Sequence, residues 1–337
     1  MSATILVTGG LGYIGSHTTV ELIQKGYTVI IADNLSNSEP FILDRIEQVT
    51  GIRPLFYQHD LCDINAVRKI FAENKIDVVI HFAAYKSVSE SVKEPLKYFH
   101  NNLQSLMNVL QAMQEHKVKQ IVFSSSATVY GEPDQLPITE NAPFKKALSA
   151  YGSTKQMGEE ILEKICDTGA VKNISLRYFN PVGAHASALL GELPKGTPNN
   201  LFPFVTQTAI GKIKQLTVFG DDYNTPDGSC IRDYIHVVDL AKAHVQACKR
   251  LLEEKTAPNF EVFNIGTGKG TSVLEMIHAF ENTTGAQLNY TIGPRREGDA
   301  PAVFAATDKA NELLNWKAEL ELTSMITTAW KWQQQLI

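Results

Sequence analysis

The sequence predicts an α/β fold, in which a doubly wound parallel sheet is followed by a smaller C-terminal α/β domain. Two observations predict it. Short apolar runs alternate with longer amphipathic segments through the first half of the chain. Such alternation is typical of strands that are buried on both faces and joined by crossover helices. In addition, a glycine-rich string joins the first apolar run to the first amphipathic segment.

Candidate strands and helices alternate in order along the first half of the chain. The strands are the apolar runs at 3–7, 28–32, 54–58, 77–81, 119–124 and 173–177. The helices are the amphipathic stretches at 13–25, 41–49, 63–74, 94–115 and 150–166. This order predicts a Rossmann-type sheet with helices on both of its faces.

The composition changes after Tyr178-Phe179-Asn180-Pro181. Residues 181–234 are rich in Gly, Pro, Asn and aromatic residues, so we expect a loop-rich insertion there. The later elements are a strand at 260–265 and helices at 237–252, 272–283 and 322–334. We therefore expect a nucleotide-binding domain at 1–180, to which the chain returns at about 235–265. Residues 181–337 would form a mainly substrate-binding domain.

The turn after the first strand predicts a dinucleotide site, because glycines stand at Gly9, Gly12 and Gly15. Such glycines let backbone N–H groups approach a pyrophosphate at the positive end of a helix. The second strand ends at Asp33, whose carboxylate suits the ribose 2′-hydroxyl of NAD. No arginine follows Asp33 directly to receive a 2′-phosphate, so NAD is favoured over NADP. Taken alone, the string is also compatible with a plain glycine-rich turn.

Two further motifs carry groups suited to acid–base chemistry. Tyr151 and Lys155 stand four residues apart on a predicted helix and therefore share a face. A tyrosine base at neutral pH needs a pKa about three units below its free value near 10. We expect the Lys155 ammonium and a positive nicotinamide ring to lower it. Ser124, Ser125 and Ser126 end a strand, where a hydroxyl can orient a substrate oxygen. The alternative interpretation of the Tyr151–Lys155 pair is an exposed helix face, and that of the serines is a polar turn after a strand.

Composition argues against several other classes of function. The net charge of −5 argues against a general binder of nucleic acids or anionic membranes. The nine histidines show neither HExxH nor close carboxylate spacing, so no metal site is predicted. The four cysteines are scattered, and no apolar run is long enough to span a bilayer. With no signal peptide at the start, we expect a cytoplasmic protein with free thiols.

Taken together, these motifs resemble those of the extended short-chain dehydrogenase/reductase family, and within it the branch of UDP-hexose 4-epimerases. The resemblance runs over nearly the whole chain. Its motifs are Val7–His17, Val79–Ala83, Phe123–Gly131, Tyr151–Lys155, Leu176–His185, Pro198–Leu201, Ile231–His236 and Arg295–Asp299.

The resemblance implies a homodimeric 4-epimerase that keeps NAD bound, with helices 94–115 and 150–166 pairing across a two-fold axis. Ser126 and Tyr151 would face the sugar 4-hydroxyl, and Lys155 would bond the nicotinamide ribose. NAD would be held by Gly9, Gly12, Tyr13, Ile14, Gly15, Asp33, Asn34, Asn37, Ser38, Asp60, Leu61, Phe82, Ala83, Ala84, Lys86, Asn101, Ser124, Tyr151, Lys155 and Tyr178. The UDP-sugar would be held by Ser126, Tyr151, Asn180, Asn200, Thr217, Val218, Phe219, Arg232, Arg296, Asp299 and Val303.

Three alternatives concern the substrate and the class of protein. Val303 stands where relatives restricted to glucose carry a tyrosine, so we expect turnover of UDP-N-acetylhexosamines as well; an epimerase acting mainly on these is the alternative. A 4,6-dehydratase would need a Thr-Asp-Glu string where this chain has Ser126-Ala127-Thr128. An NAD-sensing module without catalysis would need neither the Tyr151–Lys155 pair nor the arginines at 232 and 296.

Overall fold

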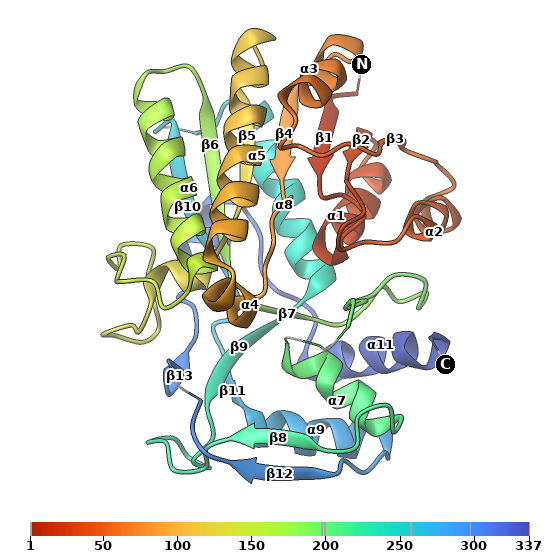
Figure 1. Cartoon of the computed structure of the whole chain (residues 1–337), viewed down its shortest axis with the longest axis vertical. Helices are drawn as coiled ribbons and strands as arrows, with labels where there is room; N and C mark the ends of the chain where they lie inside the picture. The colour runs from red at the N-terminus through yellow and green to blue at the C-terminus, as the bar shows by residue number, and fades with distance from the viewer. Residues whose placement is uncertain (1, 197, 199, 257, 297, 337) are drawn as a thin grey trace.

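The computed structural model of this chain describes residues 2–196, 198, 200–256, 258–296 and 298–336. Its central feature is a seven-stranded parallel sheet in the order β10-β6-β5-β4-β1-β2-β3 (Figure 1). The strands are β1 (Thr4–Thr8), β2 (Thr28–Ala32), β3 (Leu55–Tyr57), β4 (Val78–His81), β5 (Gln120–Ser126), β6 (Lys172–Tyr178) and β10 (Phe260–Ile265). The predicted Rossmann-type fold is confirmed. The strand order reverses between β1 and β4, where such sheets bind ligands.

Helices cover both faces of this sheet. One face carries α1 (Tyr13–Gln24), α2 (Phe41–Thr50) and α8 (Val237–Leu252). The other face carries α3 (Ile64–Glu73), α5 (Pro95–Glu115) and α6 (Ala150–Asp167). Successive side chains of a strand point to opposite faces, so Ile5 and Val7 enter the core under α1, whereas Leu6 enters the core under α5. This burial on both faces explains the continuous apolar runs of the sequence.

Two short helices flank the sheet: α4 (Val88–Lys93) precedes α5, and the 3-10 helix η1 (Ala127–Tyr130) follows β5. α10 (Asp308–Leu313) packs against β10, and its Ala310 enters the core under α1. No described helix combines the length and apolar character needed to cross a membrane.

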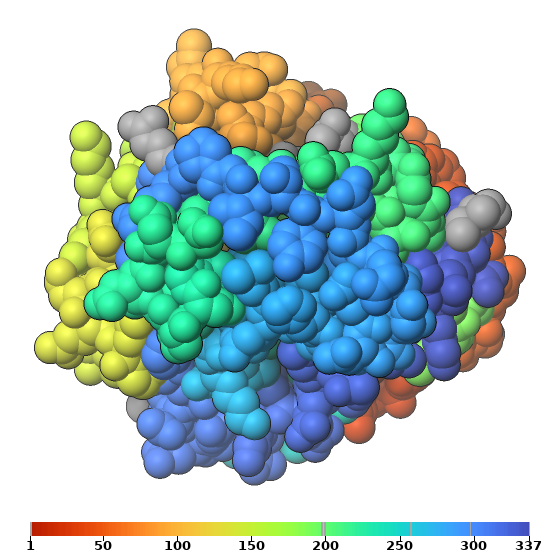
Figure 2. Space-filling model, turned by 90° about the horizontal axis from the view of Figure 1, so that it is seen from below, coloured from red at the N-terminus to blue at the C-terminus, as the bar shows by residue number. Residues whose placement is uncertain are grey.

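The C-terminal part of the chain builds smaller sheets at one end of the molecule. One contains β7 (Asn180–Val182), β9 (Ile231–His236), β11 (Gly270–Ser272) and β13 (Ala302–Val303). The other pairs β8 (Leu216–Phe219) with β12 (Tyr290–Gly293). The helices α7 (Leu201–Ala209), α9 (Val273–Thr284) and α11 (Leu322–Gln335) share a separate core with them. Seen from below, these green and blue segments cover most of this end (Figure 2).

Most of the stretch 181–234 lies outside helices and strands, as expected of a loop-rich insertion, but it also contains α7, β8, the end of β7 and the start of β9, which were not expected. The elements are short, and their apolar partners lie far along the chain. Phe202 of α7, for example, packs edge-on against Phe280 of α9, with ring centroids 6.2 Å apart. The local composition therefore gave no indication of these elements.

Candidate active site

A pocket of about 580 Å³ opens at the carboxyl ends of the strands where their order reverses. Every residue that the resemblance assigns to NAD lines this pocket. Among the further lining residues, which sequence reasoning missed, are Ser36, His59, Tyr85, Gly191, Glu192 and Lys195. The first three follow strand ends and were within reach of a sequence argument, whereas the last three come from the stretch expected to be a loop-rich insertion.

The glycine turn forms a cradle with no room for side chains. Gly9 has φ of +69°, and a Cβ there would lie 2.9 Å from the backbone nitrogen of Ala83. A Cβ on Gly15 would lie 2.2 Å from the carbonyl oxygen of Gly9. No described side chain caps the start of α1 at Gly12, and its first turn has no acidic residue. The helix N-terminus therefore offers backbone N–H groups and positive potential to a pyrophosphate.

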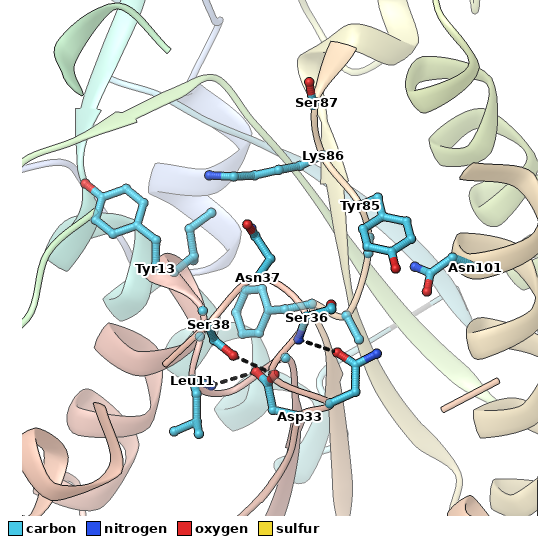
Figure 3. A pocket seen from close by; sticks show the side chains of 18 of the residues that line it. Leu11, Tyr13, Asp33, Ser36, Asn37, Ser38, Tyr85, Lys86, Ser87 and Asn101 are labelled. Carbon is cyan, nitrogen blue, oxygen red and sulfur yellow. Dashed lines mark hydrogen bonds between the residues drawn. The ribbon is translucent and has the colours of Figure 1, made fainter. Parts of the chain in front are cut away.

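Asp33 is held firmly at the end of β2. Its Oδ2 accepts a hydrogen bond from the Leu11 backbone at 3.1 Å, and its Oδ1 accepts one from Ser38 Oγ at 2.8 Å (Figure 3). Oδ1 also accepts from Leu35 N at 2.9 Å. A carboxylate has about four acceptor sites, so capacity remains for a ribose diol. Its negative charge would repel a 2′-phosphate. These residues therefore fit NAD better than NADP.

Tyr151 lies almost buried at the start of α6, with 7% of its surface exposed. Burial raises the pKa of its hydroxyl to about 12, and a hydrogen bond with Ser126 opposes this rise only in part. The expected lowering by Lys155 is not found. The Lys155 ammonium lies 5.8 Å from the centroid of the tyrosine ring, and desolvation lowers its own pKa to about 8. In the protein alone, desolvation therefore sets the direction of the Tyr151 pKa, and the Ser126 hydrogen bond opposes it.

Lys155 is fixed by the end of β5 rather than by Tyr151. Its Nζ donates to the carbonyl oxygen of Ser124 at 2.6 Å. The Ser124 hydroxyl in turn lies 2.5 Å from the hydroxyl of Tyr178 on β6. The site thus combines groups from three elements, α6, β5 and β6, and each group is oriented by a bond to another element.

Part of the residue set that the resemblance assigns to the UDP-sugar meets around Asp299. Its Oδ1 lies 3.3 Å from Arg232 Nη2 and 2.8 Å from Arg296 Nη2. The Arg296 guanidinium also lies 5.6 Å from the ring centroid of Phe219. Two cations and an aromatic ring on one carboxylate form a locally positive group in an acidic chain, which suits a diphosphate and a base.

The other residues of that set are spread over neighbouring elements. Val303 of β13 lies beside Arg232 of β9 and packs on a cluster that contains Ala127 and Phe179, the neighbours of Ser126 and Tyr178. Asn180 donates to the Asp233 carbonyl of β9 at 3.2 Å. Asn200 lines the large pocket, and Thr217 and Val218 lie on β8. The Val218 side chain is buried in the C-terminal core, so only its backbone can reach a ligand.

The motifs of this region are not described in full, because Asn199 and Glu297 lie outside the described residues. Among the residues that are described, no three His, Cys, Asp or Glu side chains gather in a group that could hold a metal ion.

The sheet, the glycine cradle and the buried tyrosine, serine and lysine define an NAD-dependent enzyme of the short-chain dehydrogenase/reductase class. A sequence model of the NAD dependent epimerase/dehydratase family matches residues 5–266. The chain belongs to this family.

Named relatives are similar over nearly the full length of the chain. The UDP-glucose 4-epimerase of Bacillus subtilis (strain 168) is 51% identical over 330 residues, which cover 98% of this chain and 96% of the relative. The crystal structure of UDP-glucose-4-epimerase from Stenotrophomonas maltophila, with bound NAD and formylated UDP-arabinopyranose, is 49% identical with a TM-score of 0.96, covering 99% and 98% of the chains. The crystal structure of UDP-glucose 4-epimerase from Bifidobacterium longum, in complex with NAD+ and UDP, is also 49% identical. Its TM-score is 0.94, and the match covers 99% of this chain and 98% of that chain.

Proposed function

We propose that this protein interconverts UDP-glucose and UDP-galactose by inverting C4 of the hexose. The observation that carries this proposal is the buried group of Tyr151, Ser126 and Lys155 at a pocket that fits NAD. Identity of 51% to a UDP-glucose 4-epimerase over nearly the whole chain supports it. The names of the relatives favour hexoses over N-acetylhexosamines as the main substrate.

Bound NAD supplies a hydride acceptor and donor for C4 of the sugar. Tyr151, as its phenolate, removes the proton of the 4-hydroxyl and returns it after inversion, and its hydrogen bond with Ser126 places it beside the sugar oxygen. The phenolate form requires that its pKa fall from about 12, which the positive charge of bound NAD would favour. Ser126 orients the sugar oxygen toward Tyr151. Lys155 and Ser124 hold the end of β5 against α6, which keeps the two hydroxyl groups in register.

Inversion requires that the hexose present both faces to one hydride position. UDP is therefore held firmly while the sugar ring turns between the two faces. Arg232 and Arg296, which Asp299 orients, would hold the diphosphate side, away from the reacting carbon. This arrangement places the binding energy in a part of the substrate that does not react.

The purified protein is expected to convert UDP-galactose to UDP-glucose without added NAD, because the same hydride returns to the sugar. Acid extraction should release about one equivalent of nicotinamide dinucleotide, which absorbance measures. The same assay separates the proposal from a 4,6-dehydratase, which would form a 4-keto-6-deoxy sugar, and from an NAD sensor, which would form no product. A protein that consumes external NAD with each turnover would contradict the self-contained cycle.

Arg232→Ala and Arg296→Ala are each expected to raise the KM for UDP-galactose roughly ten- to 150-fold, the range for losing a charge-assisted contact. Arg232 also donates to the carbonyl of Ala300 at 2.8 Å, so Arg232→Lys should recover only part of the loss. Steady-state kinetics with UDP-galactose measures kcat and KM for each variant. Unchanged KM in both alanine variants would place the diphosphate elsewhere.

Val303→Tyr tests the range of substrates. We propose that UDP-N-acetylglucosamine and UDP-N-acetylgalactosamine are also epimerised, since valine leaves space that a tyrosine ring would fill. The variant is expected to lose N-acetyl turnover and to keep hexose turnover, because close-packed sites tolerate added volume poorly. Rates on both substrate pairs measure this. Absence of N-acetyl turnover in the unmodified enzyme would mean that another residue sets the pocket size.

We further propose that residues 1–180 with 235–265 hold NAD, that 181–337 mainly hold the UDP-sugar, and that the enzyme is a cytoplasmic homodimer. α5 and α6, which lie side by side in front of the sheet (Figure 1), support the dimer. Leu96 and Met107 of α5 and Met157 of α6 are exposed, Leu96 to 81%. Exposed apolar side chains on adjacent helices are typical of an interface.

The free cysteines support the proposed cytoplasmic location, because thiols stay reduced in that compartment.

A further inference from the structure

Glu192 contacts residues that the proposed function assigns to both ligands. It lies between β7 and α7, and its Oε1 accepts from Lys86 Nζ at 3.2 Å and from Asn200 Nδ2 at 2.8 Å. Lys86 extends across the pocket toward Tyr13 (Figure 3). Asn200 stands immediately before α7. One carboxylate oxygen therefore joins a residue on the NAD side to a residue on the UDP-sugar side.

The C-terminal helix fixes the backbone of Glu192. Trp332 Nε1 of α11 donates to the Glu192 carbonyl at 2.9 Å. A Cβ on the preceding Gly191 would lie 2.4 Å from the Trp332 indole, so the segment is pressed against that ring. The Glu192 side chain is only 12% exposed. A carboxylate that is this buried needs the hydrogen bonds from Lys86 and Asn200. Because both bonds end on one oxygen, a movement of Glu192 toward one donor changes its bond to the other.

We propose that Glu192 is a positioning residue that couples the NAD and UDP-sugar sites by holding Lys86 and Asn200 through one oxygen. This inference rests on the proposed function. A ligand that orders the half-exposed Lys86 also orders Glu192 and, through it, Asn200. The second ligand then meets a side chain that has already lost its conformational freedom. By linkage, each ligand favours the other to the same extent.

The same segment offers a matched control in Lys195. This lysine is 39% exposed, against 46% for Lys86. Its Nζ lies 3.2 Å from Glu39 Oε1 and donates to the Leu35 carbonyl at 3.0 Å, both in the connection between β2 and α2. The contacts described for Lys195 do not include Glu192. Lys195 therefore lies on the same segment as Glu192 and matches Lys86 in charge and approximate exposure, but it does not bond to the Glu192 oxygen that holds Lys86 and Asn200.

A double-mutant cycle read out by UDP affinity tests the proposal. Isothermal calorimetry would give the Kd of UDP for the NAD-saturated protein, as the unmodified chain, Lys86→Ala, Glu192→Ala and the double variant. Lys86→Ala is expected to weaken UDP binding about twofold or more, the lower range for residues in one network. In the Glu192→Ala background the same change should have no effect. Lys195→Ala, by contrast, should change the affinity by the same factor in both backgrounds.

Equal effects of Lys86→Ala with and without Glu192, or no effect at all, would overturn the inference. Glu192→Gln keeps the shape of the side chain and replaces Glu192→Ala in the cycle if the alanine variant does not fold. Unmodified protein that fails to bind UDP would instead refute the proposed function. Binding of UDP with independent effects refutes only the role of Glu192.

Discussion

Tyr151→Phe is expected to lower kcat for UDP-galactose roughly 10²- to 10⁴-fold, the contribution of one positioned acid–base group. The substitution removes only the hydroxyl that bonds with Ser126 and keeps the buried ring. NAD content and UDP affinity should therefore stay unchanged. Lower kcat with unchanged binding would locate the loss in the chemical step.

Product formation under saturating UDP-galactose measures this effect, and calorimetry with UDP checks binding. Tyr290→Phe is a matched control, because Tyr290 is a partly buried tyrosine of the C-terminal core outside the pocket lining. It should keep the full rate. A Tyr151→Phe enzyme with more than about a tenth of the normal rate would rule out this tyrosine as the acid–base group.

Local pattern was sufficient to predict the central sheet. The strand expected at 260–265 is β10 without any shift, and the one expected at 3–7 is β1 shifted by one residue. These strands are buried on both faces, so their apolar character is continuous and independent of the partner that covers them. The glycine turn was predictable for the same reason, because its steric requirements are local.

The C-terminal sheets were not predictable, because their strands depend on distant partners. β13 has two residues, and its Val303 pairs with Arg232 of β9. Glu192 escaped notice similarly, because its backbone is held by a hydrogen bond from Trp332, which lies 140 residues away. The direction of the Tyr151 pKa also needed the structure, since it depends on how completely the hydroxyl is buried.

Arg177→Met is expected to lower the free energy of unfolding by about 3–5 kcal/mol, the cost of leaving one partner of a buried ion pair uncompensated. Arg177 Nη2 of β6 lies 2.6 Å from Glu159 Oε2 of α6, and the two side chains are 6% and 2% exposed. The Glu159 carboxylate also accepts from Ser125 of β5. Loss of the guanidinium therefore leaves a buried charge among the three elements that carry the active site. Urea unfolding measures the change.

The double variant Arg177→Met/Glu159→Leu separates this cause from general disruption. Replacing both charges by apolar groups of similar size is often neutral or stabilising, so most of the lost stability should return. Arg68→Met, which breaks an exposed pair with Glu115, should have little effect on unfolding. If the double variant is no more stable than Arg177→Met, packing of the arginine stem rather than an unpaired charge explains the loss. Recovered stability with reduced kcat would indicate that the pair also holds α6 and β6 in the register that Lys155 and Tyr178 require.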